Sequence, residues 1–253
     1  MIEIKDVHKS FEGHEVLKGV SAKFLPGKNN LIIGQSGSGK TVLLKCIVGL
    51  FTPEQGEILY ENENFLTMSK QEVQRLRTEM GMVFQGAALF DSMSVLENIL
   101  LPLNMFDNQS PKEKLKRALF CLDRVNLKNA TDLYPSEISG GMKKRVAIAR
   151  AIALNPKYLF CDEPNSGLDP KTSLVIDELI SDITQEYNIT TIINTHDMNS
   201  VLGIGDNIIF INKGNLAWQG NKKEVIGSQN EELENFIFAS DFLKNARDNQ
   251  SAH

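Results

Sequence analysis

The sequence predicts an α/β fold in which a mainly parallel core sheet is wound with helices, joined to an antiparallel β lobe and interrupted by a helical insertion. Three observations lead to this prediction. A glycine-rich segment at residues 34–41 stands between a strand-like run and a helical pattern. Beyond Met142, helical and strand patterns alternate, as they do in βαβ units. Between these regions, residues 69–133 carry charged helical segments, which indicate the insertion.

The first predicted elements form the β lobe. Residues 2–7 alternate between apolar and polar side chains, and short apolar runs follow at residues 23–25 and 30–33. From Thr41 the apolar residues recur with helical spacing and stop near Gly49. The expected order here is therefore strand, glycine-rich loop, helix.

The later elements follow from the same two periodicities. A helix is expected within the insertion at residues 112–125, beside a short apolar run at residues 99–106. After Met142 we expect, in order, a helix to residue 154, a strand at 158–161, a helix at 171–187, and strands at 190–194 and 207–211. Lys213-Gly214 then predicts a hairpin.

Composition and charge narrow the class of protein. The chain has 253 residues, of which 42% are hydrophobic, enough to bury a substantial core. A formal net charge of −5 argues against nucleic acid as a partner. The three cysteines lie far apart and form no CxxC pair, so neither a disulfide framework nor a zinc site is indicated. The opening residues lack the pattern of an export signal.

Apolar stretches indicate how the chain meets a membrane. The two most apolar runs, residues 42–51 and 99–106, are far shorter than the roughly 20 residues that cross a bilayer. No membrane span is therefore expected, and any membrane role would be peripheral.

The glycine-rich segment has the pattern of a phosphate-binding loop. Small residues at such a loop let successive backbone N–H groups surround phosphate oxygens at a helix N-terminus. Lys40 would hold the β and γ phosphates, and Thr41 would place its hydroxyl on Mg²⁺. The alternative is a glycine-rich turn without a ligand. The candidate nucleotide-binding residues are Gly34, Ser36, Gly37, Ser38, Gly39, Lys40 and Thr41.

Two adjacent acids follow an apolar strand at residues 158–161. Carboxylates at the end of a buried strand are costly unless a cation or another partner receives them. Beside a phosphate-binding loop, Asp162 is placed to bind Mg²⁺, and Glu163 to orient and deprotonate an attacking water. A capped strand end is the alternative reading of the same two residues.

A third motif resembles a family signature. Residues 138–142 read Ile-Ser-Gly-Gly-Met and resemble the signature sequence of ATP-binding cassette (ABC) ATPases. Ser139, Gly140 and Gly141 open a predicted helix and would form an anion site, although a simple helix N-cap accounts for the pentapeptide alone. In the resembled family this site covers the nucleotide of the opposite subunit, which implies a homodimer.

The resemblance covers most of the chain, from residue 2 to about residue 220. It implies a phosphate-binding-loop NTPase fold of the ABC cassette type, with ATP and Mg²⁺ as cofactors. Gln85 resembles the Q-loop glutamine that touches Mg²⁺ and the water, and residues 166–169 resemble the D-loop at the dimer interface. His196 resembles the switch histidine on the γ-phosphate, and Phe11 the aromatic stacked on adenine. A lone histidine or phenylalanine is otherwise more often structural.

Three residues depart from the commonest family pattern: Phe11, Ile138 and Met142 replace tyrosine, leucine and glutamine. Phenylalanine keeps a stacking face and isoleucine an apolar anchor, whereas the methionine removes a polar side chain. Met142, with residues 85–91 and 95–98, resembles one branch of the family, the ATPases of Mla-type phospholipid transporters. That branch works with an integral membrane permease and an MCE-domain lipid-binding protein.

The expected function is therefore an ATP-hydrolysing motor subunit of a membrane ABC transporter. The resemblance implies phospholipid moved between inner and outer membranes, with the chain cytoplasmic and held at the inner membrane through the permease. Alternatives are a motor for lipoprotein release or for small-solute transport, and an ABC ATPase that acts outside transport. Sustained heptads and a second cassette, which would favour the last alternative, are not seen.

The predicted organisation is one nucleotide-binding domain at residues 1–220, with the helical insertion at about 86–140, and a short C-terminal extension at 221–253. The extension resembles an amphipathic helix followed by a polar end. Leu233, Phe236, Ile237 and Phe242 could cross to the partner cassette or pack on their own subunit, and the sequence leaves both open.

Overall fold

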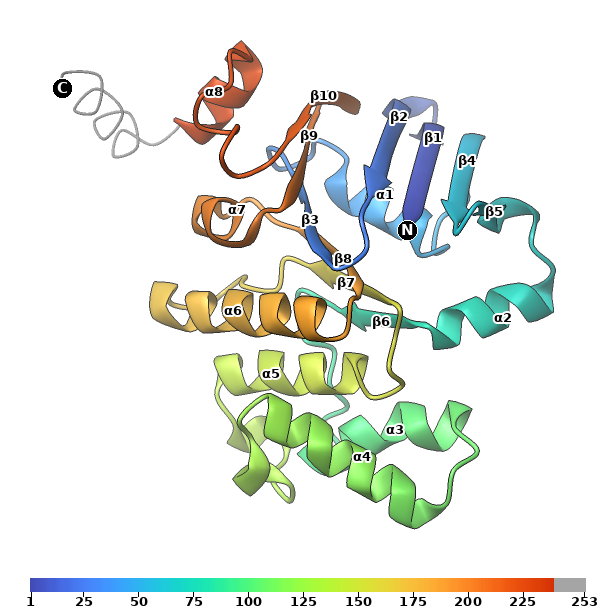
Figure 1. The fold of residues 1–253 in the computed structure, drawn as a ribbon, viewed down its shortest axis with the longest axis vertical. Helices are drawn as coiled ribbons and strands as arrows, with labels where there is room; N and C mark the ends of the chain where they lie inside the picture. Colours follow the sequence, from blue (N-terminus) through green and yellow to red (C-terminus); the bar gives the residue numbers. More distant parts are fainter. Residues whose placement is uncertain (239–253) are drawn as a thin grey trace.

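The computed structural model describes residues 1–238 and opens with an antiparallel sheet (Figure 1). Its strand order is β2-β1-β4-β5. Ile2 and Ile4 of β1 are buried, as alternation along a strand requires. Val7 is buried as well, because the pairing of β1 with β2 shifts register between Ile4 and Val7. Strand bounds are Ile2–Phe11 for β1, His14–Phe24 for β2, Gln55–Tyr60 for β4 and Glu63–Asn64 for β5.

A second sheet of six strands forms the core, in the order β10-β9-β3-β8-β7-β6. Neighbouring strands from β9 to β6 run parallel, and β10 pairs antiparallel with β9. Strand bounds are Lys28–Ile33 for β3, Met80–Val83 for β6, Tyr158–Asp162 for β7, Thr190–Asn194 for β8, Asn207–Asn212 for β9 and Asn215–Gly220 for β10. This confirms the predicted α/β fold with a mainly parallel core sheet.

Helices cover the core sheet, and α3, α4 and α5 form the lower part of the molecule in Figure 1. Their bounds are Lys40–Ile47 for α1, Lys70–Thr78 for α2, Val95–Phe106 for α3, Pro111–Arg124 for α4, Gly140–Ala151 for α5, Pro170–Glu186 for α6, Met198–Ile204 for α7 and Glu231–Ile237 for α8. Short 3₁₀ turns lie at Phe65–Thr67, Lys128–Ala130 and Pro135–Glu137.

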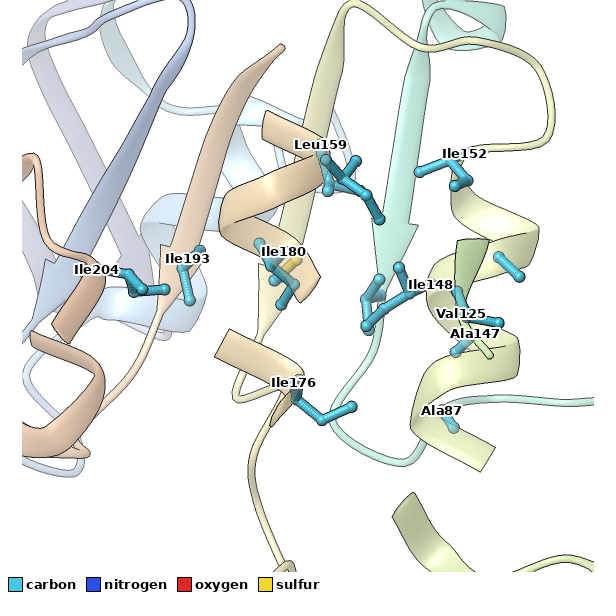
Figure 2. Close-up of a cluster of buried hydrophobic side chains, with 14 of the residues drawn as sticks. Ala87, Val125, Ala147, Ile148, Ile152, Leu159, Ile176, Ile180, Ile193 and Ile204 are labelled. Carbon is cyan, nitrogen blue, oxygen red and sulfur yellow. The ribbon is translucent and has the colours of Figure 1, made fainter. Parts of the chain in front are cut away.

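Two hydrophobic cores hold the sheets and helices together. One packs α1 and the antiparallel sheet against one face of the core sheet, and includes Phe24 and Phe160. The other packs α5 and α6 against the opposite face, where Ile148, Ile180 and Leu159 converge (Figure 2). Each of these side chains is fully buried and stabilises the fold by about 1.5–3 kcal/mol. The core sheet is therefore covered on both faces.

The structure corrects part of the predicted middle region. Residues 69–133 were expected to be mainly helical, but Met80–Val83 forms β6, which pairs with β7 at the edge of the core sheet. Four residues that include Gly81 are too short to show a strand period. Strands β4 and β5 and helix α7 have no counterpart among the predicted elements, whereas α2 falls within the stretch that was expected to be helical.

The C-terminal helix α8 packs on its own subunit. Leu233 and Ile237 are buried, and the ring of Phe236 stacks on Phe210 of β9 at 5.4 Å. These contacts favour the own-subunit alternative for the three residues, while Phe242 lies outside the described residues. Among residues 1–238, no helix has the length and apolar character needed to cross a membrane.

Candidate nucleotide-binding site

Three neighbouring parallel strands end at the same edge of the core sheet and supply the site. β3 leads into the phosphate-binding loop, β7 into the acid pair, and β8 into the segment that contains His196. Register places Asn194 opposite both Ile32 and Asp162. Because β8 lies between β3 and β7, the carboxyl ends of the three strands meet there, which is where ligands bind in open α/β sheets.

The phosphate-binding loop curls over its own lysine. Lys40 is buried at the start of α1, and its Nζ donates to the carbonyl oxygens of Gly34 at 2.8 Å and Gln35 at 3.1 Å. Burial lowers the pKa of Lys40, while the nearby charges of Glu163 and Asp162 act to raise it. The ammonium is thus held at the centre of the loop, at the helix N-terminus where anions are favoured.

The loop packs closely against β9, and one of its hydroxyl groups is positioned for a ligand. A Cβ at Gly34 would lie 2.2 Å from the carbonyl oxygen of Ile211, so only glycine is accommodated at this closely packed position. The hydroxyl of Ser38 is buried and has no hydrogen-bond partner among residues 1–238, although buried polar groups are almost always paired. Ser36 and Gly37 lie exposed at the tip of the loop. An anion seated in the loop would satisfy the Ser38 hydroxyl.

Asp162 joins the loop to β8. Thr41 Oγ1 donates to Asp162 Oδ1 at 3.4 Å, and Asn194 Nδ2 donates to the same oxygen at 3.0 Å. Asn194 Oδ1 is buried and has no hydrogen-bond partner in the part of the chain that the structure describes. A hydroxyl, a carboxylate and a free amide oxygen form the oxygen-rich set that Mg²⁺ prefers, so these residues fit the ion.

Glu163 and His196 form the second pair at the sheet edge. His196 Nδ1 lies 2.9 Å from Glu163 Oε1, and its side chain is 67% exposed whereas that of Glu163 is 16% exposed. Glu163 has a φ of +49°, an uncommon conformation for a residue with a side chain. Its N–H donates to the carbonyl of Asn194 at 3.0 Å. The backbone at Glu163 is thereby fixed, with the carboxylate next to the imidazole.

Gln85 reaches the D-loop in this structure. Its Nε2 donates to Ser166 Oγ at 3.1 Å, and the glutamine side chain is exposed. The Q-loop backbone around it is tied to α5, because Lys144 Nζ donates to the carbonyl of Gln85. The predicted Q-loop and D-loop residues are therefore in contact.

The signature residues open α5 and remain accessible. Ser139 is its N-cap, accepting from the N–H of Met142 at 3.2 Å, as the simple-cap alternative predicts. Ser139 and Gly140 are nevertheless exposed, whereas a Cβ at Gly141 would lie 2.7 Å from Thr172 of α6. Met142 packs against the core beneath α5, so it has an apolar role here.

Phe11 is the last residue of β1. Its ring meets Phe51 edge-on at 5.2 Å, and Lys9 Nζ lies 5.1 Å from its centroid. The ring is 39% exposed, so a face remains accessible to a flat ligand.

Sequence reasoning missed two residues that organise the site and gave a third no role of its own. Lys144 and Arg150 belong to a helix rich in charge, and Asn194 was expected only as the first residue of the segment that resembles the switch loop. Lys144 falls three residues after Gly141 and four before Ile148, on a face that is buried. This spacing was the signal from which the role of Lys144 could have been inferred, because a lysine on a buried helix face needs a hydrogen-bonding or charged partner.

A phosphate-binding loop, an oxygen-rich pair of strand ends and a carboxylate paired with histidine define a phosphate-loop nucleoside triphosphatase. The ABC transporter family model matches residues 17–166. The chain therefore belongs to the ABC transporter family, and it is an ATP-binding subunit that hydrolyses ATP. The expected family, fold class and enzyme class are thereby confirmed.

Two relatives of this chain are ATP-binding proteins of import systems. The methionine import ATP-binding protein MetN of Clostridium tetani is 38% identical over 247 residues, which are 97% of this chain and 77% of the relative. The L-cystine import ATP-binding protein TcyC of Bacillus subtilis is 37% identical, over 92% of this chain and 95% of the relative. These relatives do not support the expected Mla-type assignment or an MCE-domain partner.

A solved structure supports the fold and the nucleotide. The dimeric structure of a post-hydrolysis state of the ATP-binding cassette MJ0796, bound to ADP and Pi, has a TM-score of 0.79 and 33% identity. It matches 88% of this chain and 99% of that chain.

Proposed function

We propose that the chain is the motor subunit of a membrane importer and hydrolyses ATP at two sites shared between two copies of itself. The observation that carries this proposal is the placement of Glu163, partly buried beside His196 and one residue from Asp162, at the edge that also holds Lys40. A carboxylate in this position can accept a proton from an attacking water.

Each residue has a distinct task in the proposed reaction. Lys40 supplies positive charge to the β and γ phosphates, and the loop N–H groups orient them. Glu163 takes the proton from the water, while the neighbouring imidazole of His196 orients the carboxylate and meets the γ-phosphate. Thr41, Asp162 and Gln85 would hold Mg²⁺, which when bound offsets phosphate charge. Phe11 stacks on the adenine.

The homodimer follows from the exposed signature. Ser139 and Gly140 lie at the accessible start of α5, where the helix dipole favours an anion. The phosphate-binding loop already provides one anion site per chain, so the second would serve the partner's nucleotide. The dimeric state of the MJ0796 cassette supports this arrangement.

An apolar groove between the helical insertion and the core sheet offers a place for an integral membrane permease. Phe90, Met105 and Phe106 are about half exposed there, and Leu101 and Pro102 line the same groove. Exposed apolar patches of this kind mark interaction surfaces. Through such a permease the chain would be held at the cytoplasmic side of the inner membrane.

We propose a small polar solute, such as an amino acid, as the cargo class. MetN and TcyC are both named as amino-acid importers, and both match almost all of this chain. This supports the small-solute alternative over phospholipid.

A second candidate cargo is phospholipid, favoured by the resemblance of residues 85–91, 95–98 and Met142 to Mla-type ATPases. Two of these residues, Asn98 and Met142, have a structural role in this chain. Asn98 ties down the loop before α3, and Met142 packs under α5. An MCE-domain partner belongs to this second candidate alone.

Purification of the tagged chain from its own membranes in mild detergent, followed by mass spectrometry, tests the assignment. A permease with bound amino acid or a solute-binding protein would support the first cargo. A permease with an MCE-domain protein and phospholipid would support the second. Recovery of no membrane protein would overturn the transporter role.

Turnover tests the assigned base separately. Glu163→Gln removes the proton acceptor while keeping the size, so the ATP hydrolysis rate is expected to fall at least about 100-fold. Glu178→Gln makes the same change on the exposed surface of α6 and should leave the rate unchanged. A Glu163→Gln protein with the original rate would refute the assignment.

A further inference from the structure

A buried lysine on α5 contacts the main chain on both sides of the catalytic site. Lys144 is only 5% exposed, and its Nζ donates to the carbonyl of Gln85 in the Q-loop. The same Nζ donates to the carbonyl of Glu163 at 3.4 Å. One cation therefore connects the signature helix to the two segments that carry the proposed water-orienting residues.

The charge of Lys144 is met by carbonyl oxygens. Within residues 1–238, the ion pairs found include none between Lys144 and a carboxylate. Burial lowers the pKa of Lys144, so the ammonium is costly at this position. A neutral residue would fill the space on this buried face of α5 without that cost. The role of Lys144 is therefore to form these hydrogen bonds and not to fill space in the core.

Arg150 extends the same connection along the Q-loop. Its guanidinium donates to the carbonyls of Ala88 at 2.8 Å and Ala87 at 2.9 Å. Ala87 and Ala88 have φ values of +61° and +49°, so the loop adopts an uncommon backbone shape where the arginine holds it. Arg150 and Ala88 also line the apolar groove. The cationic contacts from α5 therefore run from Glu163 to the groove.

We propose that Lys144 is a positioning residue for ATP hydrolysis, holding the main chain of Gln85 and Glu163 at a fixed spacing from the signature helix. The proposal rests on the proposed roles of Gln85 and Glu163. Through these two contacts, a displacement of α5 would be transmitted to both segments. Binding of ATP depends instead on the phosphate-binding loop and Phe11, which Lys144 does not touch.

A split between turnover and binding tests this role. Lys144→Met keeps the approximate length of the side chain but removes its charge and its N–H donors. Lys144→Gln removes the charge but keeps an amide NH₂ group as a donor, on a shorter side chain. Because a misplacement of about 1 Å can cost about 100-fold, kcat is expected to fall about 10- to 100-fold in Lys144→Met. Lys144→Gln should lie between it and the original protein.

The affinity for ATP, measured by titration of a fluorescent ATP analogue, should stay within about twofold of the original in both variants. Lys143→Met removes a neighbouring lysine that makes no such contact and should leave kcat and affinity unchanged. An unchanged kcat in Lys144→Met, or a parallel loss of affinity and kcat, would overturn the proposal.

If Lys144→Met does not fold, as judged by its thermal midpoint, Lys144→Gln decides by the same criteria. Measuring Glu163→Gln alongside separates the assignment of Glu163 as the base from the positioning role of Lys144. Retained turnover in Glu163→Gln would refute the base, whereas loss in Glu163→Gln with normal kcat in the Lys144 variants would refute only the positioning role.

Discussion

Asn98 provides a sharp test of how the groove is built. The side chain is fully buried on α3, and its Oδ1 accepts from the N–H of Phe90 at 2.9 Å. Its Nδ2 lies within hydrogen-bond distance of the carbonyls of Phe90, Met93 and Ser94, at 3.0–3.1 Å. The loop backbone is therefore held by hydrogen bonds to one side-chain amide instead of by pairing in a sheet or helix. These bonds fix Phe90 where it lines the groove.

The loss on truncation follows from these contacts. An amide has two N–H donors, so three hydrogen bonds at most are fully formed, one accepted and two donated. At about 1 kcal/mol each, Asn98→Ala is expected to lower the free energy of unfolding by about 3 kcal/mol. The carbonyls of Phe90 and Ser94 keep bonds from the N–H groups of Met93 and Asn98. The N–H of Phe90 and the carbonyl of Met93 lose the amide as a partner in a partly buried loop, where water compensates only in part.

Urea denaturation followed by circular dichroism measures this loss. Asn104→Ala, on the exposed side of the same helix, is the matched control and should change the free energy of unfolding by less than about 0.5 kcal/mol. A loss below about 1 kcal/mol for Asn98→Ala, or one equal to the control, would show that the amide does not organise the loop.

Two other changes probe the packing of the core. Gly81→Ala would place a Cβ 2.4 Å from a carbonyl oxygen of α5 and should lower the free energy of unfolding by about 1–3 kcal/mol. A Cβ at Gly203 meets no atom, so Gly203→Ala should stabilise α7. Thermal midpoints that move in the same direction in the two variants would contradict this. Asp177 accepts from Asn165 at 2.8 Å and from Ser200 at 2.7 Å, so Asp177→Ala should cost about 2–4 kcal/mol of unfolding free energy. Burial raises the pKa of Asp177, so the original protein should lose stability relative to Asp177→Asn as the pH rises through that raised pKa; a flat difference across the acid range would refute this.

The part of the site at the sheet edge was predictable because each of its motifs follows directly after a strand, and these strands are neighbours in the sheet. Glycine spacing before Lys40, the acids after residues 158–161 and the polar residues after 190–194 are all local patterns. Parallel pairing of β3, β8 and β7 then brings Thr41, Asp162 and Asn194 within hydrogen-bond distance. Local signals sufficed where the fold topology itself assembles the residues.

Features set by tertiary contacts were not predictable in the same way. β6 is a strand because β7 supplies its hydrogen bonds, and its four residues carry no clear period. Lys144 sits in a run of basic residues that resembles a solvated helix face, and only its contacts with Gln85 and Glu163 reveal its position. The side on which α8 packs was equally open, because an amphipathic helix shows that it has an apolar face but not what covers it.

The central claim is that each hydrolytic site is shared between two chains, and the mass of Glu163→Gln in solution tests it most directly. Light scattering after size exclusion should give a monomer without nucleotide and a dimer holding two ATP molecules when ATP and Mg²⁺ are added. Replacing Ser139 with a bulky residue should abolish the dimer while each chain still binds ATP. A Glu163→Gln chain that binds ATP tightly and remains a monomer would contradict the account.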